Sequence, residues 1–369
     1  MTALHDAELQ AVADGLDAGH TLPARWYADP ETLEREQELI FRRNWQYAGR
    51  AEQVATPGSY LTTHAGLVPL AVVRDRAGTL RALVNVCRHR GHYVLAGAGS
   101  CSSLQCPYHA WTYDLDGALR KVPRGDAEPG LDFAELGLLP ASVAEWGPFV
   151  FVHPEPEAPP FADALGELPA VLAGCGVELE RLDFYRRIPW TFAANWKIAI
   201  ENYLECYHCP TAHPGLAKAI DVTADGYALA THPSFSVQKG APRDPSAAAG
   251  TAFMLDGAIS RAQYHWLWPN VTINIDPGPQ NLSLDVWLPD GPGRTRGFTE
   301  YFFGADVPAE TIDDIMAFSR QVAEEDTALV EAVQRGMNSG AVATGRLMPR
   351  SEQLVAHFQR LVLGALREG

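Results

Sequence analysis

The sequence predicts an α+β protein in which an all-β domain precedes a domain built of helices and strands. Three observations predict this class. Residues 7–45 have a helical pattern, residues 46–153 divide into short alternating apolar segments, and the rest of the chain has helix-like segments on both sides of strand-like ones. The predicted parts are therefore helices at 1–45, an all-β domain at 46–153 and an α+β domain at 154–369.

Two helices are expected before residue 45. Asp29, a good helix cap, precedes Pro30, and proline is favoured at the first helical position. A helix therefore begins at this pair.

Strands are expected in the all-β domain, where short segments of alternating apolar residues are separated by Gly, Pro and Asp. The clearest segments are GLVPLAVVRD (66–75), LRALVNVC (80–87) and GPFVFVHP (147–154). The stretch PEPEAPPFADALGELP (154–169), which is rich in proline and acid, reads as a linker and marks the domain boundary.

The second domain is expected to order its elements as helix, sheet and long helix. TFAANWKIAIENYLECYH (191–208) has a helical pattern, and SLDVWLP (283–289) and RGFTEYFF (296–303) have strand patterns. Helical patterns return at about 308–336 and 351–367.

Composition excludes several classes of function. The formal net charge of −16 gives no basic footprint for nucleic acid and disfavours an anionic membrane surface. The amino terminus lacks a secretory pattern and no stretch approaches ~18 uninterrupted apolar residues, so we expect a cytoplasmic protein. Six cysteines, several beside histidines, favour metal ligands or reduced thiols over a disulfide framework.

A first candidate metal site lies between residues 87 and 109. Cys87 and His89 form one pair and Cys106 and His109 form another, with sixteen residues between them. A tetrahedral zinc site and a [2Fe-2S] cluster with two histidine ligands both use this donor set. Because each pair offers one cysteine and one histidine, the spacing favours the cluster over zinc.

The two loops resemble those of the Rieske family. CRHRG and CPYHAWTYDLDG match its ligand loops, including Pro107, Trp111 and Gly117. The resemblance implies that Cys87 and Cys106 hold one iron of the cluster and that His89 and His109 hold the other. The same segment contains Cys101 and His92, which fall outside the ligand spacing and are expected to be structural.

A second candidate site lies in NWKIAIENYLECYHCPTAHPG (195–215), which contains Glu205, His208 and His213. On one continuous helix, His213 would point about 140° away from His208. Pro210 cannot continue a helix, so we expect the chain to turn there and bring the two imidazoles together. A carboxylate would complete a two-histidine, one-carboxylate iron site.

Asp326 is the candidate carboxylate because it lies within a predicted apolar stripe, whereas Glu324 and Glu331 lie towards the other side of the same helix. A carboxylate on an apolar face is costly unless it is paired or bound to a metal. The stripe consists of Val322, Ala323, Leu329, Val330, Val333 and Met337.

Together the two sites resemble those of the Rieske non-haem iron oxygenases, large (alpha) subunit type. The resemblance implies an all-β Rieske [2Fe-2S] domain at 46–153 and a helix-grip catalytic domain at 154–369, on which the helices at 1–45 pack. It also implies that His208, His213 and Asp326 bind Fe(II). Glu205, where many members have Asp, would be the electron bridge to the cluster of a neighbouring subunit in a homotrimer.

The expected reaction is monooxygenation or dioxygenation with O2 as co-substrate. The chain has no G-x-G-x-x-G fingerprint, so we expect electrons from NAD(P)H through a separate reductase or ferredoxin. An electron carrier without catalysis is the alternative from another class.

The substrate is expected to be a small quaternary ammonium compound or amine, because ECYHC and AHPG look like the branch acting on carnitine and glycine betaine. Hydroxylation of an aromatic ring or O-demethylation of an aryl ether is the alternative. Cys206 and Cys209 are expected to be structural thiols. Aromatic candidates for binding a cation are Tyr203, Tyr207, Tyr264, Trp266 and Trp268.

Overall fold

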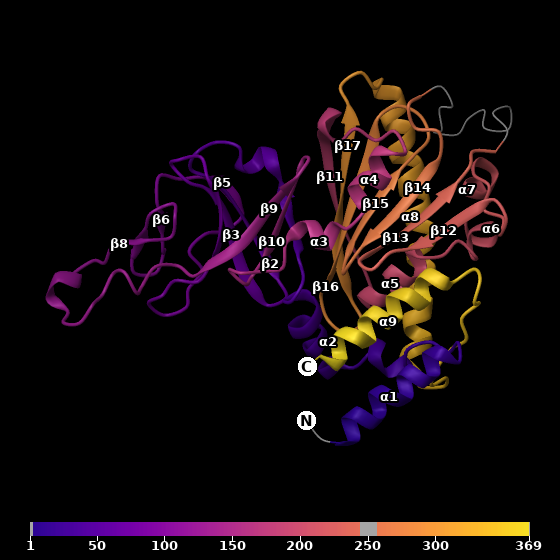
Figure 1. The fold of residues 1–369 in the computed structure, drawn as a ribbon, viewed down its shortest axis with the longest axis horizontal. Coiled ribbons are helices and arrows are strands. Elements are labelled where there is room, and N and C mark those ends of the chain that lie inside the picture. The colour runs from indigo at the N-terminus through magenta and orange to yellow at the C-terminus, as the bar shows by residue number, and fades with distance from the viewer. Residues whose placement is uncertain (1–2, 244–256, 369) are drawn as a thin grey trace. The chain divides into compact units, whose positions relative to one another are not determined.

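The computed structural model describes residues 3–243 and 257–368 (Figure 1). The chain forms two compact units. The β unit comprises Gln37–Ala164, and the α+β unit comprises Met1–Glu36 together with Leu165–Gly369. Residues 37–45 and 154–164, which the sequence analysis placed outside the all-β domain, thus belong to the β unit.

The β unit contains a seven-stranded antiparallel sheet and a three-stranded one. The larger sheet has the order β1-β10-β9-β4-β3-β2-β5, and the smaller one has the order β6-β7-β8. The strands are β1 (Gln46–Arg50), β2 (Ser59–Ala65), β3 (Val68–Arg74), β4 (Leu80–Val84), β5 (Ala98–Ser100), β6 (Leu104–Gln105), β7 (Thr112–Tyr113), β8 (Leu119–Lys121), β9 (Pro140–Trp146) and β10 (Phe149–His153). The strands predicted within 66–75, 80–87 and 147–154 are confirmed as β3, β4 and β10.

Short helical segments flank these strands. They are Gln37–Phe41, Ala51–Val54, Gly125–Ala127 and α3 (Phe161–Leu165). One of the unit's apolar cores contains Cys87, Cys106, Trp111 and Tyr113. The cysteines of the first candidate site are therefore anchored in packed protein.

The α+β unit is organised around one seven-stranded antiparallel sheet with the order β11-β17-β16-β15-β14-β13-β12. Its strands are β11 (Leu182–Phe192), β12 (Tyr227–Thr231), β13 (Phe235–Gly240), β14 (Ala262–Leu267), β15 (Val271–Ile275), β16 (Asn281–Pro289) and β17 (Thr295–Gly304). The strands predicted at 283–289 and 296–303 are confirmed within β16 and β17.

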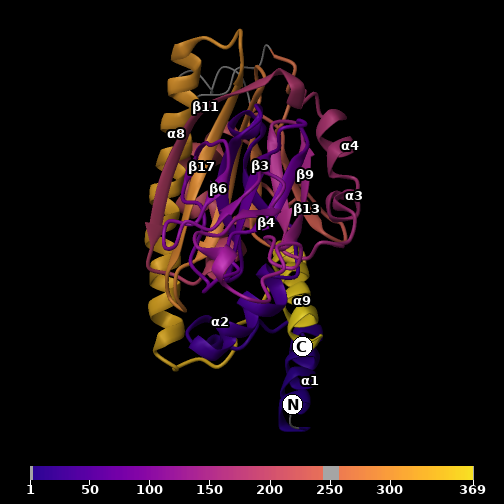
Figure 2. The same ribbon diagram turned by 90° about the vertical axis from the view of Figure 1, so that its left-hand side faces the viewer.

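The helices of the α+β unit come from both ends and the middle of the chain. They are α1 (Ala3–Asp17), a turn of 3-10 helix (Ala24–Tyr27), α2 (Pro30–Glu36), α4 (Leu168–Ala173), a second 3-10 turn (Leu179–Arg181), α5 (Trp196–Tyr203), α6 (Cys209–Ala212), α7 (Pro214–Ala219), α8 (Ala309–Asn338) and α9 (Gln353–Arg367). Figure 2 shows α8 running along the sheet beside β11 and β17.

The amino-terminal helices are fixed to this unit by a buried ion pair. Lys197 Nζ lies 2.6 Å from Glu36 Oε1 and 2.9 Å from the Trp26 carbonyl oxygen, and Lys197 and Glu36 are both fully buried. The Trp196 indole donates to the other Glu36 oxygen at 2.7 Å. The helix start predicted at Asp29 is confirmed, because its side chain accepts a hydrogen bond from the Thr32 backbone at 3.0 Å.

The apolar stripe predicted on α8 is partly wrong. Leu329 and Val333 are 38% and 45% exposed, whereas Val330 and Gln334 are buried. The true buried row runs through Ile315, Val330 and Gln334, close to a helical period of 3.6. Gln334 belongs to it because its side chain bonds the backbones of Tyr27 and Asn195.

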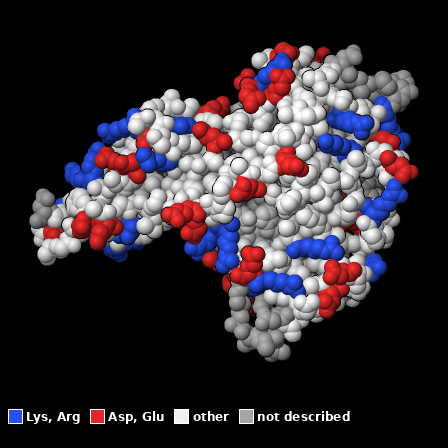
Figure 3. Space-filling model, in the orientation of Figure 1, with Lys and Arg blue, Asp and Glu red and all other residues white. Residues whose placement is uncertain are grey.

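The distribution of surface charge agrees with the absence of a basic footprint for nucleic acid that the net charge indicated. On the face drawn in Figure 3, basic side chains are interspersed with acidic ones and no basic face forms. Within the described residues, none of the helices has the length and apolar character needed to span a membrane.

Candidate active site

The two cysteine–histidine loops of the β unit have the same backbone form. In each loop the carbonyl of the cysteine accepts a hydrogen bond from the amide four residues on, from Gly91 to Cys87 and from Ala110 to Cys106, both at 3.0 Å. Gly91 and Ala110 both have positive φ, +76° and +57°. This left-handed conformation turns each chain back tightly, so each loop can present a thiol and an imidazole together.

The four donors divide into a buried thiol pair and an outer imidazole pair. Cys87 and Cys106 are buried at 3% and 2%, and the rings of His89 and His109 lie 4.6 Å apart between centroids. Desolvation raises the pKa of the Cys106 thiol, helped by the neighbouring Cys87. The donor set of two thiols behind two imidazoles fits a histidine-ligated [2Fe-2S] cluster.

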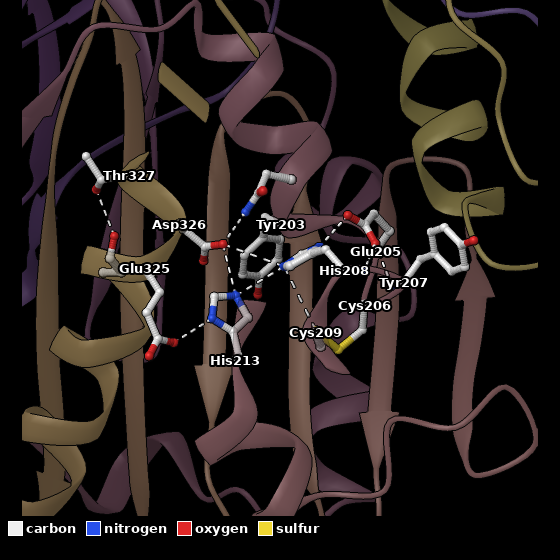
Figure 4. Close-up of polar contacts among 12 residues, drawn as sticks. Tyr203, Glu205, Cys206, Tyr207, His208, Cys209, His213, Glu325, Asp326 and Thr327 are labelled. Atoms are coloured by element: carbon white, nitrogen blue, oxygen red, sulfur yellow. Dashed lines mark hydrogen bonds and ion pairs between the residues drawn. A yellow bond between two sulfur atoms is a disulfide. The ribbon is translucent and has the colours of Figure 1, made fainter. Parts of the chain in front are cut away.

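In the α+β unit, His208, His213 and Asp326 point toward one another (Figure 4). One donor atom from each lies within 4.8 Å of the other two. His213 Nε2 is 3.1 Å from His208 Nε2 and 3.0 Å from Asp326 Oδ1, and His208 Nε2 is 3.6 Å from the same oxygen. This set fits a metal with two imidazole ligands and one carboxylate ligand.

A second layer of acids holds the outer nitrogens of both imidazoles. Glu205 Oε1 contacts His208 Nδ1, and Glu325 Oε2 lies 2.7 Å from His213 Nδ1. Burial lowers the pKa of His213, but the hydrogen bonds and charges of Asp326 and Glu325 outweigh it, so the net pKa is raised. Carboxylates on Nδ1 orient each ring with Nε2 facing the metal position.

The local backbone differs from the predicted helix over 191–208. Residues up to Phe192 belong to β11, Asn195 caps α5, and α5 ends at Tyr203. Glu205 and His208 therefore lie in a turn, where Glu205 Oε2 accepts hydrogen bonds from the amides of Tyr207 and His208. Pro210 does not end a helix but sits in the first turn of α6, a position where proline is favoured.

Asp326 lies in α8 and is positioned by a hydrogen bond from α5. Asn202 Nδ2 donates to Asp326 Oδ1 at 2.8 Å. Glu331 lies outside the cavity and accepts a hydrogen bond from the Ala193 amide at 2.9 Å, whereas Glu324, also predicted on the other side of the helix, lines the cavity, so that prediction is wrong for Glu324. Asp326 therefore contacts residues that lie more than 100 positions earlier in the sequence.

Comparison with known proteins gives the family. Residues 44–139 match the model of the Rieske [2Fe-2S] domain, and residues 179–368 match the catalytic domain of the ring hydroxylating alpha subunit. The chain is 32% identical over 357 residues to a carnitine monooxygenase oxygenase subunit of Acinetobacter pittii, covering 94% of this chain and 95% of the relative. It is also 31% identical to the chloroplastic choline monooxygenase of Spinacia oleracea, covering 92% and 76%.

The chain belongs to the Rieske non-haem iron oxygenases as an alpha subunit. A solved quaternary ammonium Rieske monooxygenase in complex with L-carnitine has a TM-score of 0.80 at 30% identity, covering 94% of this chain and 95% of that one. The naphthalene 1,2-dioxygenase of Rhodococcus sp. has a TM-score of 0.79 at 20% identity, covering 99% and 98%, and shows the fold alone. The family implies a Rieske [2Fe-2S] cluster and a catalytic iron.

A cavity of about 400 Å³ in the Rieske oxygenase subunit opens onto the three converging ligands. Its wall consists of one face of the sheet together with α5 and α8. Tyr203 and Tyr264, two of the aromatic candidates, line it. Tyr203 donates to Asn274 Oδ1 at 2.9 Å, so its hydroxyl is fixed within the wall.

The other three aromatic candidates do not line this cavity, so their predicted role in binding a substrate there finds no support. Tyr207 is 62% exposed and points away from the ligands (Figure 4). Trp266 shares the sheet face of Tyr264, as strand alternation requires, but α9 covers it and its ring lies 5.3 Å from that of Phe358. Trp268 packs on Trp266 at 5.9 Å and does not line the cavity.

Cys206 and Cys209 are joined by a disulfide, so the prediction of two thiols is wrong. The turn between α5 and α6 brings their Cα atoms to 4.9 Å, a separation that permits the bond. Both residues also line the cavity.

Sequence analysis missed three polar residues at this site: Glu325, Asn202 and Asp276. Glu325 directly precedes the predicted ligand, and its position beside Asp326 was the available signal. Asn202 and Asp276 had no local signal, because their roles depend on contacts made across the fold.

Proposed function

We propose that this chain is the oxygenase component of a multicomponent enzyme that hydroxylates a C–H bond next to the nitrogen of a small quaternary ammonium compound or amine. The charge of the cavity carries the proposal. Its described lining includes five carboxylates and a single arginine, the exposed Arg320. Arg320 pairs with Glu324 at 4.0 Å, and Asp326 is assigned to a metal. The remaining acids, Glu205, Asp276 and Asp285, face no lysine or arginine of the described lining, which favours a cationic substrate over an aromatic acid.

The proposed iron ligands are His208, His213 and Asp326. When bound, an iron held by two imidazoles and one carboxylate supplies open positions for oxygen. Glu205 and Glu325 accept the Nδ1 protons and so hold both Nε2 lone pairs toward the ligand position. Asn202 fixes the carboxylate of Asp326 by its hydrogen bond.

The proposed cluster ligands are Cys87 and Cys106 for one iron and His89 and His109 for the other. Burial of the thiols and exposure of His89 support this arrangement. An electron donor then approaches from the imidazole side, because that side of the cluster reaches the surface.

Glu205 is the proposed bridge for electrons between subunits of a homotrimer. Its carboxylate already accepts bonds from His208 and from two backbone amides. An ionised carboxylate offers about four lone-pair sites, so it can accept a further hydrogen bond from a neighbour's cluster histidine.

A separate reductase or ferredoxin is proposed as the electron source, with NAD(P)H as its cofactor. One O2, two electrons and two protons convert a C–H bond to C–OH and release one water. When the hydroxylated carbon bears a quaternary nitrogen, the hydroxyl loses a proton as the C–N bond breaks, which yields a tertiary amine and a carbonyl compound.

The test combines the chain with a reductase, NADH and a panel of carnitine, choline, glycine betaine and aromatic acids. Oxygen uptake is followed together with aldehyde release. Uptake matched by aldehyde from a quaternary ammonium compound supports the proposal, and coupling with aromatic substrates alone refutes it. Iron analysis separates the carrier alternative, which requires two irons per chain where the oxygenase requires three.

A further inference from the structure

Asp276 is a carboxylate of the cavity wall. It follows β15 directly and lines the cavity. Over residues 3–243 and 257–368, neither a hydrogen-bond donor nor a cation offsets the burial of its side chain, and desolvation alone raises the pKa of Asp276 to about 7. Its side chain is only partly buried and faces the cavity, so a cation bound there can reach the carboxylate.

Asp285, on the same cavity face, provides a direct comparison. Its carboxylate accepts hydrogen bonds from Thr272 Oγ1 at 2.9 Å, from Asn274 Nδ2 at 2.8 Å and from Thr299 Oγ1 at 2.5 Å. Among the described residues, three side chains thus donate to Asp285 and none donates to the Asp276 carboxylate, which is available to a ligand.

Hydrogen bonds hold the backbone of Asp276 in place. The Asp276 amide donates to Asn281 Oδ1, and the Asn281 amide group donates back to the Asp276 carbonyl, both at 2.9 Å. This reciprocal pair fixes the start of the β15–β16 connection. The carboxylate is thus presented from a rigid position, which lowers the entropy cost of binding.

Tyrosine side chains line the same cavity as this carboxylate. The negative charge of Asp276 acts on the hydroxyls of Tyr264 and Tyr301, which lie on β14 and β17. Tyr264 packs in the same cluster as Phe318 of α8 and Tyr227 of β12. A cavity that combines a carboxylate with aromatic side chains stabilises a quaternary ammonium, since such a cation cannot donate hydrogen bonds.

We propose that Asp276, together with the rings of Tyr264 and Tyr301, binds the positively charged ammonium group of the substrate. This inference rests on the proposed function and names the residues that select the charge. Asp276 supplies the opposite charge, and the tyrosine rings exclude water and supply their faces. The substrate is thereby held in the cavity that His208, His213 and Asp326 line.

The test compares choline with its neutral isostere 3,3-dimethylbutan-1-ol, which has the same shape without the charge. Calorimetry of the wild type is expected to give at least about tenfold tighter binding of choline. Asp276→Asn, which keeps the shape of the side chain, is expected to reduce this preference to about twofold or less. Asp306→Asn removes an exposed charge from the same unit and is expected to keep the preference.

A second measurement needs only the wild type. Because burial raises the pKa of Asp276 to about 7, binding of a permanent cation near neutral pH is expected to release part of a proton, detected as a dependence of the binding heat on buffer. The neutral isostere is expected to release none. Within the described residues, the charge of Asp276 acts on the hydroxyls of Tyr264 and Tyr301, and burial raises the pKa of both, so they stay neutral at this pH. Burial also raises the pKa of Asp285 in the same cavity, and proton release measured with Asp276→Asn gives the contribution of Asp285.

The outcomes distinguish the two proposals. A wild type that prefers choline while folded Asp276→Asn keeps that preference overturns the role of Asp276 and leaves the substrate class standing. A wild type that binds choline no better than its isostere, and likewise does not bind carnitine or glycine betaine, overturns the substrate class and the inference together. If Asp276→Asn does not fold, the absence of cation-linked proton release in the wild type overturns the inference.

Discussion

Glu325 Oε2 lies 2.7 Å from Nδ1 of His213, while the next residue of α8, Asp326, lies 3.0 Å from Nε2 of the same imidazole. Two successive acids of one helix thus hold opposite nitrogens of one ring. The Gln321 amide holds Glu325 in turn at 3.0 Å, and that hydrogen bond, with His213, lowers the pKa of Glu325.

Glu325→Gln is expected to weaken iron binding about tenfold to a hundredfold, because the His213 ring loses the charged partner that orients it. Competition with a chelator measures the affinity. Glu310→Gln, at the far end of α8, serves as the control and is expected to match the wild type. Equal iron affinity in Glu325→Gln would show that the contact does not orient the ring.

Asp326→Ala is expected to remove the mononuclear iron while the Rieske cluster remains. Iron content should fall from about three to about two per chain, with the visible spectrum of the cluster unchanged. Three irons in the purified variant would exclude Asp326 as a ligand.

Cys106→Ser is expected to abolish the cluster spectrum and to leave about one iron per chain. Cys101→Ser is the matched control, because Cys101 lies in the same segment but outside the ligand spacing. Loss of the cluster in Cys101→Ser as well would point to a folding defect of the segment and not to ligation.

Glu205→Ala is expected to keep both metal centres but to lose most coupled turnover, by about tenfold or more. The measurement pairs iron analysis and cluster spectrum with product formed per NADH oxidised. Glu205→Asp, which keeps the carboxylate on a side chain one methylene shorter, is expected to retain part of the activity. Normal turnover in Glu205→Ala would refute the bridge.

Glu201→Gln is expected to flatten the dependence of stability on pH. Burial raises the pKa of Glu201 to about 7, against hydrogen bonds from Tyr27 and Gln359, so the protonated form is favoured in the folded state. The stability from this group is full below an unfolded pKa near 4.5 and is lost as the pH rises through 7, by up to about 3 kcal/mol. Chemical denaturation at pH 5 and pH 8 measures the difference, and an unchanged slope in the variant would contradict it.

Sequence reasoning reached the residues whose signals are local. The pairs Cys87/His89 and Cys106/His109 were predicted from their spacing. Asp326 was predicted from a stripe that is partly exposed, yet it does lie beside His208 and His213. The end of α5 at Tyr203 was missed because the Glu205 side chain bonds nearby amides, which competes with the helix. Trp266 was misjudged because Phe358, about ninety residues later, covers it.

The α+β unit takes its first helices and its last helix from opposite ends of the chain, and this has a consequence during synthesis. Arg35 donates to the carbonyl of Leu366, 331 residues away. At roughly 5–20 residues per second, the ribosome delivers Leu366 about 20 to 70 seconds after Arg35. The β unit can be complete well before then, while the apolar faces of the first helices remain without their partner, so this is the interval in which a nascent chain most needs protection by chaperones.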